Sequence, residues 1–442
     1  MNLLKFDLSQ PAGQFKLLNA TNGGPMCKRH AVDQSRSNLD DYKAARIPYT
    51  RNHDSAVNST YGGPYSHDIS CIFPNFDADP TDPASYDFAC TDEEILKGLE
   101  ANTKTFFRLG QTIEHHIVKH NTLPPKDFKK WAVICEHIIR HYTEGWANGF
   151  YHDMPYWEIW NEADLCGDDS PDKLTWGGTK AQFFDFYEIA SKHLKACFPH
   201  LKIGGPALAG NVTWANDFLC EMQKRNVEID FFSWHIYTTE IAHVGRRANA
   251  INDLLVKYGY ENTESILNEW NYVKGWGINE QGENMFIYSL EVMRKAKGAA
   301  FISAVISLSQ AEPIDMLMYY DTRPSTFNGV FEFYTLRPLK GYYSLYWYGM
   351  FYDMKHEVKC QTSVDDIYTL CGVDESGKTL TLVTYYTDDD NAANKTVTLD
   401  YGKQGEYEVY LVDETHDGQL IGKTTNLELD MPANSMMLIK EI

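Results

Sequence analysis

The order of apolar and polar positions divides the chain into two regions. Up to about residue 345, near-continuous apolar runs alternate with amphipathic stretches. Beyond it, short segments alternate apolar with polar residues. Continuous apolar runs are typical of parallel strands buried on both faces, whereas strict alternation is typical of antiparallel strands with one solvated face. The pattern therefore predicts an α/β region followed by an all-β region.

The first region carries a repeated strand-then-helix rhythm. Its predicted strands are "FKLLNA" near residue 15, "IPYTRN" near 47, "KTFFRLG" at 104, "YWEIWN" at 156, "LKIGGPAL" at 201, "DFFSWHIY" at 230, "ESILNEW" at 264 and "AAFISAVISL" at 299. Amphipathic stretches lie between them, at about 127–142, 179–199, 214–225, 247–258 and 284–297. In the second of these, Thr179 is a predicted N-cap and Pro199 ends the helix. Eight such strands are the count of a (β/α)8 (TIM) barrel, although a doubly wound sheet has the same local rhythm.

The second region predicts an antiparallel β-sandwich. The segments "DIYTLCGV", "TLTLVTYYT", "KTVTLDY", "EYEVYLVDE" and "SMMLIKEI" alternate, and turn signals such as "DESGK" and "GKQGE" separate them. The amino-terminal "LLKFDLS" alternates too, and we expect it to add a strand to the sandwich. The expected domains are thus an amino-terminal strand (1–14), a barrel (15–345) and a sandwich (346–442).

Length and charge narrow the classes of function. A chain of 442 residues suits a barrel of about 250 residues plus an accessory domain. The net charge of −21 argues against nucleic-acid and anionic-membrane partners, and there is no apolar run long enough to span a membrane. The start, "MNLLKFDLSQ", lacks the apolar segment of a signal peptide, which leaves a cytoplasmic protein or an exported one whose signal was removed. The nine cysteines form no CxxC pair and indicate free thiols. The oligomeric state stays open, with a homo-oligomer among the alternatives.

Candidate chemistry lies where the barrel strands end, because function gathers at the carboxyl ends of these strands. The polar residues at the ends of the second, fourth, sixth and seventh predicted strands are Arg51, Asn52, His53, Asn161, Glu162, His235, Tyr237, Asn268 and Glu269. Two of them, Glu162 and Glu269, are carboxylates that would face each other across the barrel mouth. Two facing carboxylates with different surroundings are what glycoside hydrolysis needs.

The neighbours of the two acids assign their roles. Glu162 follows Asn161, whose amide can hydrogen-bond a sugar hydroxyl, and we expect it to act as acid/base. Arg51 is a permanent cation that would hold Glu269 ionised as the nucleophile. Alternatives remain for each residue. A strand-end acid can cap the next helix, Arg51 can pair with a structural carboxylate, and His235 can be a core histidine.

Other groups carry weaker signals. His115 and His116 with Glu114, and His137 with His141, resemble metal clusters but do not match a pattern such as HExxH, and solvated faces explain them better. There is no GxGxxG or Walker pattern, so no phosphate-binding loop is inferred. We expect no metal and no cofactor. A set of tryptophans could either stack on sugar faces or pack in the core: Trp176, Trp270 and Trp276.

The segments "YWEIWNEADL", "DFFSWHIY" and "SILNEWNY", in this order, resemble glycoside hydrolase family 39 of clan A. The resemblance covers nearly the whole chain and implies a (β/α)8 barrel with a β-sandwich. It implies that Glu162 is the acid/base and Glu269 the nucleophile of a retaining mechanism. It also implies a set of substrate-binding residues, to which we add Trp270: Arg51, His53, Asn161, His235 and Tyr237. Known members include exo-acting β-xylosidases and α-L-iduronidases.

The chain departs from the family pattern at Ala163, where Pro is usual, at Asn268, where Thr or Asp is usual, and in the segment "DISCIFPNFDADPTDPASYDFACTDEE". These departures bear on sugar specificity and leave the two glutamates intact.

The leading interpretation is a retaining, exo-acting glycoside hydrolase that removes terminal xylosyl, arabinosyl or related sugars from an oligosaccharide or glycoside. A barrel that binds glycans without hydrolysing them is the main alternative. A metal-dependent barrel hydrolase would need more His and Asp at strand ends than His53 and His235 supply. The sandwich shows no exposed aromatic row, and we interpret it as a structural buttress.

Overall fold

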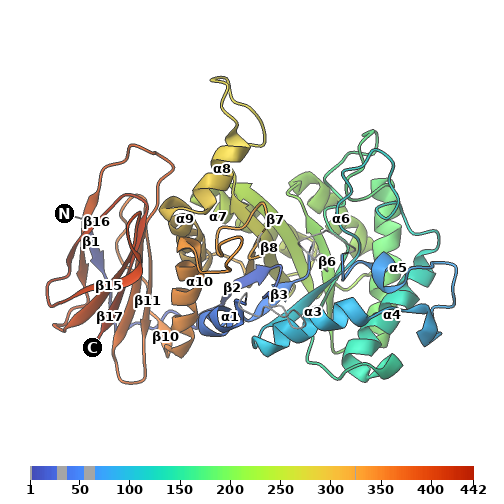
Figure 1. Cartoon of the computed structure of the whole chain (residues 1–442), viewed down its shortest axis with the longest axis horizontal. Coiled ribbons are helices and arrows are strands. Elements are labelled where there is room, and N and C mark those ends of the chain that lie inside the picture. Colours follow the sequence, from blue (N-terminus) through green and yellow to red (C-terminus); the bar gives the residue numbers. More distant parts are fainter. Residues whose placement is uncertain (1, 27–36, 54–64, 324) are drawn as a thin grey trace.

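The computed structural model describes residues 2–26, 37–53, 65–323 and 325–442. Within these ranges, eight parallel strands close into a barrel, and two further sheets pack beside it as a β-sandwich (Figure 1). The predicted TIM barrel with an accessory β-sandwich is confirmed.

Each barrel strand pairs in parallel with the next, and β9 closes the barrel on β2. The strands are β2 (Leu17–Asn22), β3 (Tyr49–Arg51), β4 (Lys104–Leu109), β5 (Tyr156–Ile159), β6 (Lys202–Leu208), β7 (Phe231–Thr238), β8 (Glu264–Tyr272) and β9 (Met316–Tyr319). An apolar cluster fills the barrel interior: Ala20, Phe106, Tyr156, Phe231, Ile266, Met316 and Met318. A layer of buried polar side chains at the carboxyl ends of the strands continues this core toward the mouth.

Helices surround the barrel. They are α1 (Leu39–Ala45), α2 (Ile69–Ile72), α3 (Ala89–Glu100), α4 (Phe128–Glu144), α5 (Lys180–Cys197), α6 (Val212–Lys224), α7 (Ile241–Lys257), α8 (Met285–Met293), α9 (Ala296–Ser309) and α10 (Lys340–Met350), with 3-10 turns at Pro83–Ser85, Trp146–Asn148 and Phe351–Asp353. Thr179 caps α5 through a capping box with Gln182, as its sequence predicts, and the helix ends at Cys197, before Pro199.

The eighth predicted strand is wrong. The segment at 299–308 lies in helix α9, and the last barrel strand is the short β9 after it. A continuous apolar run is equally consistent with a buried strand and with a helix that is buried all round. Helix α9 is the second kind, because it lies between the barrel and the sandwich and nearly all its residues are buried.

The sandwich consists of a three-stranded and a six-stranded sheet. The first has the order β1-β13-β16 and the second the order β10-β11-β12-β17-β14-β15. Their strands are β1 (Asn2–Lys5), β10 (His356–Glu357), β11 (Ile367–Val373), β12 (Thr379–Tyr385), β13 (Lys395–Asp400), β14 (Tyr407–Val412), β15 (Asp417–Thr424), β16 (Glu428–Met431) and β17 (Ser435–Glu441). The amino-terminal strand β1 pairs with β13, as "LLKFDLS" predicts.

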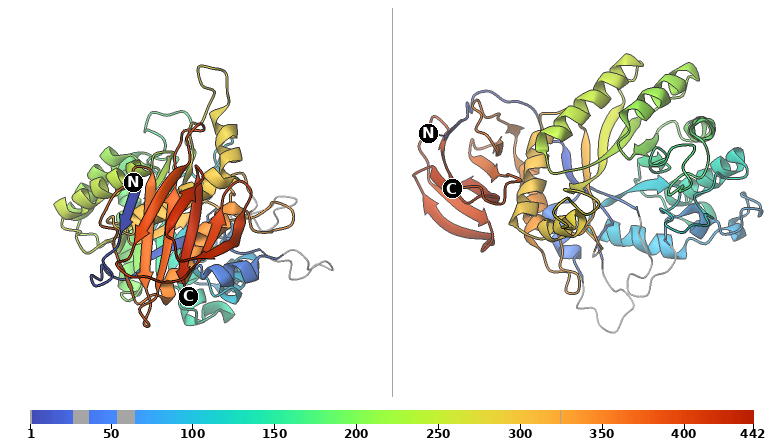
Figure 2. Two further views of the ribbon diagram at one scale, coloured as in Figure 1. Left: turned by 90° about the vertical axis from the view of Figure 1, so that its left-hand side faces the viewer. Right: turned by 90° about the horizontal axis from the view of Figure 1, so that it is seen from above.

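The central strands β12 and β17 of the six-stranded sheet are largely buried on both faces, whereas the edge strand β15 is mostly exposed. One face packs on the three-stranded sheet, and the other packs on α9 and α10, which separate it from the barrel (Figure 2, right). Helix α10 runs through residue 345, and we propose the end of this helix as the boundary between barrel and sandwich. In the described parts of the chain, no helix combines the length and the apolar character that a bilayer crossing requires.

Candidate active site

The barrel brings the two strand-end glutamates together. Glu162 follows β5, Glu269 lies in β8, and His235 lies in β7. One carboxylate oxygen of each glutamate and a ring nitrogen of His235 all lie within 4.8 Å of one another. The side chain of Glu162 is 12% exposed and that of Glu269 is 7% exposed, so both carboxylates reach the edge of solvent at the barrel mouth.

The backbone after β5 turns Glu162 toward the mouth. Trp160 (φ 72°) and Glu162 (φ 50°) both adopt the left-handed conformation, which is uncommon for residues other than glycine and is typical of functional sites. The amide of Glu162 donates to the carbonyl of Ala207 (2.8 Å), and the Thr175 hydroxyl donates to the carbonyl of Glu162 (2.6 Å). The next helix is capped by Thr179 instead, so the capping alternative for Glu162 is wrong.

Glu162 contacts a buried histidine. Its Oε1 lies 2.8 Å from Nδ1 of His235, which is fully buried. Burial lowers the pKa of His235 below its ordinary value, and nearby Arg51 lowers it further, whereas Glu269 raises it. The hydrogen bond fixes the orientation of Glu162 without adding a full charge at neutral pH.

Glu269 accepts hydrogen bonds on both oxygens. The hydroxyl of Tyr237 donates to Oε1 (2.6 Å), and the guanidinium of Arg51 donates to Oε2 (3.2 Å). Burial raises the pKa of Glu269 above the ordinary glutamate value, and the charge of Glu162 adds to this. His235, Arg51 and the Tyr237 hydrogen bond oppose it. Arg51 therefore favours the ionised form, as expected, but desolvation outweighs it.

Arg51 also binds a second buried carboxylate, Glu158, which the sequence pattern did not single out. Its Nε donates to Glu158 (2.7 Å), and a terminal nitrogen of its guanidinium donates to the side-chain Oδ1 of Asn161 (2.5 Å). Glu158 accepts further hydrogen bonds from Ser233 (2.6 Å) and Asn268 (2.5 Å). Asn268, one of the departures from the family pattern, thus serves this buried network. Strand alternation could have identified Glu158 from the sequence. It lies two residues after Tyr156, which faces the barrel interior, so its side chain faces the interior too.

Trp270 lies outside the site. Its ring is buried, and it packs against Tyr319 and against Phe301 of α9, on the outer face of the barrel wall. The reason is a bulge in β8. His235 pairs with Glu269 whereas its neighbour Trp234 pairs with Leu267, so Asn268 is an extra residue. A bulge re-aims the side chains after it, and this one turns Glu269 inward and Trp270 outward.

The remaining predicted residues lie nearby or in the core. His53 is buried, with Nε2 3.9 Å from Glu269, beyond hydrogen-bond distance, and burial lowers its pKa well below the ordinary histidine value. Trp176 is buried, and its indole N–H donates to the Thr179 carbonyl. Trp276, in contrast, is 62% exposed, and its ring contacts the ring of Tyr237.

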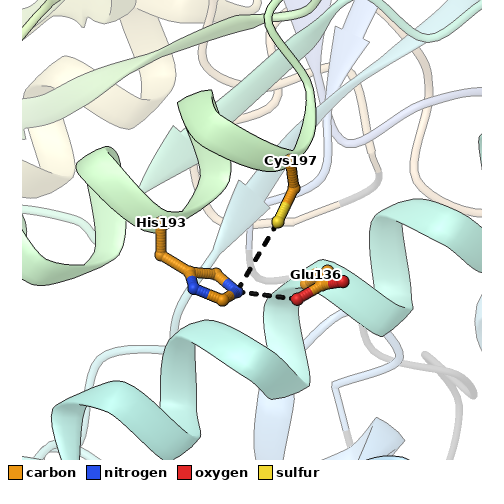
Figure 3. A group of neighbouring side chains, drawn as sticks. All are labelled: Glu136, His193 and Cys197. Carbon is orange, nitrogen blue, oxygen red and sulfur yellow. Dashed lines mark hydrogen bonds and ion pairs between the residues drawn. The ribbon is translucent and has the colours of Figure 1, made fainter.

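Among the described residues, two groups of side chains have the donor types of metal ligands. Glu162, His235 and Glu269 are one, and Arg51 already supplies a positive charge to Glu269 there. The other lies between α4 and α5 (Figure 3) and comprises Glu136, His193 and Cys197.

In this second group, His193 Nε2 lies 2.7 Å from Glu136 and 3.8 Å from the sulfur of Cys197. Arg140 also donates to Glu136 (2.8 Å), so the group braces the two helices by hydrogen bonds. His137 and His141, which resembled a metal pair in sequence, bind backbone carbonyls instead, of Val133 and Trp146.

Comparisons with known proteins agree with this fold. The model of the family described as glycosyl hydrolases family 39 matches residues 67–332. A β-xylosidase of Geobacillus stearothermophilus is 30% identical over 172 residues, which are 36% of this chain and 32% of that protein. The match thus spans about a third of that relative's length. A glucosidase structure from Croceicoccus marinus superposes with a TM-score of 0.78 at 21% identity, covering 100% of this chain and 98% of that one. A monomeric β-xylosidase structure from Caulobacter crescentus gives 0.70 at 15% identity, covering 100% and 99%.

Proposed function

Because this chain belongs to glycosyl hydrolases family 39, we propose that it is a retaining, exo-acting glycoside hydrolase that removes terminal xylosyl residues from oligosaccharides or glycosides. In this proposal Glu162 is the acid/base and Glu269 the nucleophile. The substrate-binding residues are Arg51, His53, Asn161, His235 and Tyr237.

The separation of the two carboxylates carries this proposal. Retaining enzymes hold their two carboxyl groups about 5–5.5 Å apart, whereas inverting enzymes need about 6.5–9.5 Å to admit a water molecule. An oxygen of Glu162 lies within 4.8 Å of an oxygen of Glu269, which supports retention.

The surroundings of the two acids support their separate roles. Glu269 receives two donors, Arg51 and Tyr237, which stabilise a carboxylate that attacks carbon. Glu162 contacts His235, whose pKa is lowered by burial, and a neighbour without a full charge suits a group that must carry a proton at the start of the reaction. Asn161 accepts from Arg51 through its oxygen, which orients its NH2 group as a donor for a sugar hydroxyl.

The proposed reaction has two steps. Glu269 attacks the anomeric carbon while Glu162 gives its proton to the glycosidic oxygen. The bond between that carbon and that oxygen breaks, and a glycosyl ester of Glu269 forms. Glu162, now ionised, takes a proton from water, whose oxygen attacks the same carbon and breaks the ester. Two inversions give net retention.

The choice of xylose rests on the β-xylosidase relatives, which match part of the chain. A panel of aryl glycosides (xyloside, arabinosides, galactoside, glucoside, iduronide) tests it. We expect the aryl β-xyloside to have the highest kcat/KM, and proton NMR to show the β-anomer as the first-formed product. An α-anomer formed first would contradict retention, a different preferred glycone would contradict xylose, and binding without turnover would favour a glycan-binding barrel.

A further inference from the structure

The loop between β8 and α8 (273–284) projects from the body of the molecule above α8 (Figure 1) and carries an exposed tryptophan. A bridge between Ile278 and Asn284 pairs its two arms, and the amide of Met285 donates to the carbonyl of Gly277 (2.9 Å). Asn284 then caps α8. These contacts fix the position of Trp276, which leaves 62% of its surface exposed.

Trp276 belongs to an aromatic group beside the candidate nucleophile. Its ring is stacked on Phe286 (5.5 Å between centroids) and contacts Phe327 (6.1 Å) and, edge to face, Tyr237 (5.3 Å). The side chain of Asn271 in β8 donates to the carbonyl of Phe327 (3.0 Å), which ties the segment that follows β9 to the barrel. The aromatic group is therefore held in place by the loop before α8, by α8 itself and by the segment after β9.

The side chain of Tyr237 bridges the candidate nucleophile and the indole of Trp276. The hydroxyl of Tyr237 donates to Glu269 at 2.6 Å, and the ring of the same Tyr237 contacts Trp276. One phenol ring thus separates the nucleophile from the indole, and a pyranose ring is of similar size. With Phe286 stacked on it, the indole presents its remaining surface to solvent, where the C–H groups of a sugar can pack on it.

We propose that Trp276 is the platform of a subsite for the sugar on the leaving-group side of the cleaved bond. This inference rests on the proposed exo-acting hydrolase. In such an enzyme the terminal sugar lies deepest, so the leaving-group sugar emerges toward solvent at the mouth, where Trp276 is exposed. The ligand class is a β-linked oligosaccharide with a pyranose as its second unit.

Two substrates with the same glycone test the subsite. Xylobiose fills it, whereas β-xylosyl fluoride has a leaving group too small to reach it. For Trp276→Ala we expect kcat/KM to fall about tenfold on xylobiose and to stay near the wild-type value on the fluoride. Trp276→Phe should keep most of the xylobiose activity, because it keeps an aromatic surface.

Ile278→Ala is the matched control, because Ile278 lies on the same loop and is 72% exposed but has an aliphatic side chain that offers no aromatic surface. We expect it to leave both activities unchanged. Unchanged xylobiose hydrolysis by Trp276→Ala, or an equal loss on both substrates, would overturn the subsite while leaving the proposed function intact. A wild-type enzyme that cleaves neither substrate would contradict the proposed xylosidase and the subsite with it.

Discussion

At Glu269, burial and hydrogen bonding act on the same carboxylate in opposite directions. Burial raises its pKa, and the donors Arg51 and Tyr237 lower it. The proposed nucleophile must be ionised to react, so we expect activity to be lost as pH falls through this pKa. Since the net shift is upward, the acidic limb of the kcat/KM profile should lie above the ordinary pKa of a glutamate.

Tyr237→Phe tests the balance at this carboxylate. The change removes the 2.6 Å hydrogen bond to Glu269. Because this hydrogen bond lowers the pKa of Glu269, its loss should raise that pKa. We therefore expect the acidic limb of the profile to move to higher pH, and kcat/KM to fall about 10- to 100-fold at neutral pH. The burial of Tyr237 raises its own pKa well above the ordinary tyrosine value, so the lost donor is protonated throughout this range. A profile with an unmoved acidic limb would show that the hydroxyl does not act on the nucleophile.

At the scale of elements, Arg51 joins three strands of the barrel. From β3 it binds Glu158 of β5 and Glu269 of β8, and it is fully buried. Arg51→Met should raise the pKa of Glu269, because it removes a cation that lowers it. It also leaves Glu158 buried with its cation removed, and breaking a buried ion pair costs about 3–5 kcal/mol of stability. We therefore expect both a shifted acidic limb and a lower denaturation midpoint.

A double variant separates these two effects of Arg51. Glu158→Gln added to Arg51→Met removes the orphaned charge, so chemical denaturation should show much of the lost stability restored. The shifted pH profile should persist, because Glu269 still lacks its cation. If the double variant is no more stable than Arg51→Met, then the Arg51–Glu158 pair is not what fixes these strands.

Local pattern was sufficient to predict most barrel strands and to place Glu162 and Glu269 at the ends of two of them, but not the details that depend on strand register. The bulge at Asn268 breaks the period of two, and only pairing with β7 reveals it, so Trp270 could not be assigned to the outer face from sequence. Glu158 was hidden for a related reason. Its partners Arg51, Ser233 and Asn268 come from three other strands, and a buried carboxylate is recognised through its partners.

At the scale of the whole molecule, α9 was misassigned because its environment is set by the other domain. A helix that packs against the barrel on one side and the sandwich on the other loses the amphipathic pattern by which helices are recognised. Phe301 of α9 shows this double packing. It contacts Trp270 and Tyr272 of β8, and also Tyr386, which follows β12 of the sandwich.

Phe301→Ala should therefore weaken the contact between barrel and sandwich. The cavity that it leaves is expected to cost about 3–5 kcal/mol, because the surrounding rings can collapse only in part. We expect a lower thermal midpoint with near-normal kcat at temperatures where the variant is folded. Ile117→Ala, at a position 99% exposed, serves as the control and should change the midpoint little. A midpoint like that of the control would mean that the two domains are stabilised independently of α9.

The assignment of the two glutamates is tested most directly by trapping the intermediate. A 2-deoxy-2-fluoro-β-xyloside with a good leaving group slows both steps, and its leaving group keeps the first step the faster, so a retaining enzyme accumulates the glycosyl ester. We predict that mass spectrometry of the intact protein will show one added fluoroxylosyl group, and that peptide mapping will place it on Glu269. A label on Glu162 would contradict the account. So would an enzyme that still hydrolyses the unfluorinated xyloside but carries no label after prolonged incubation with the fluorinated one.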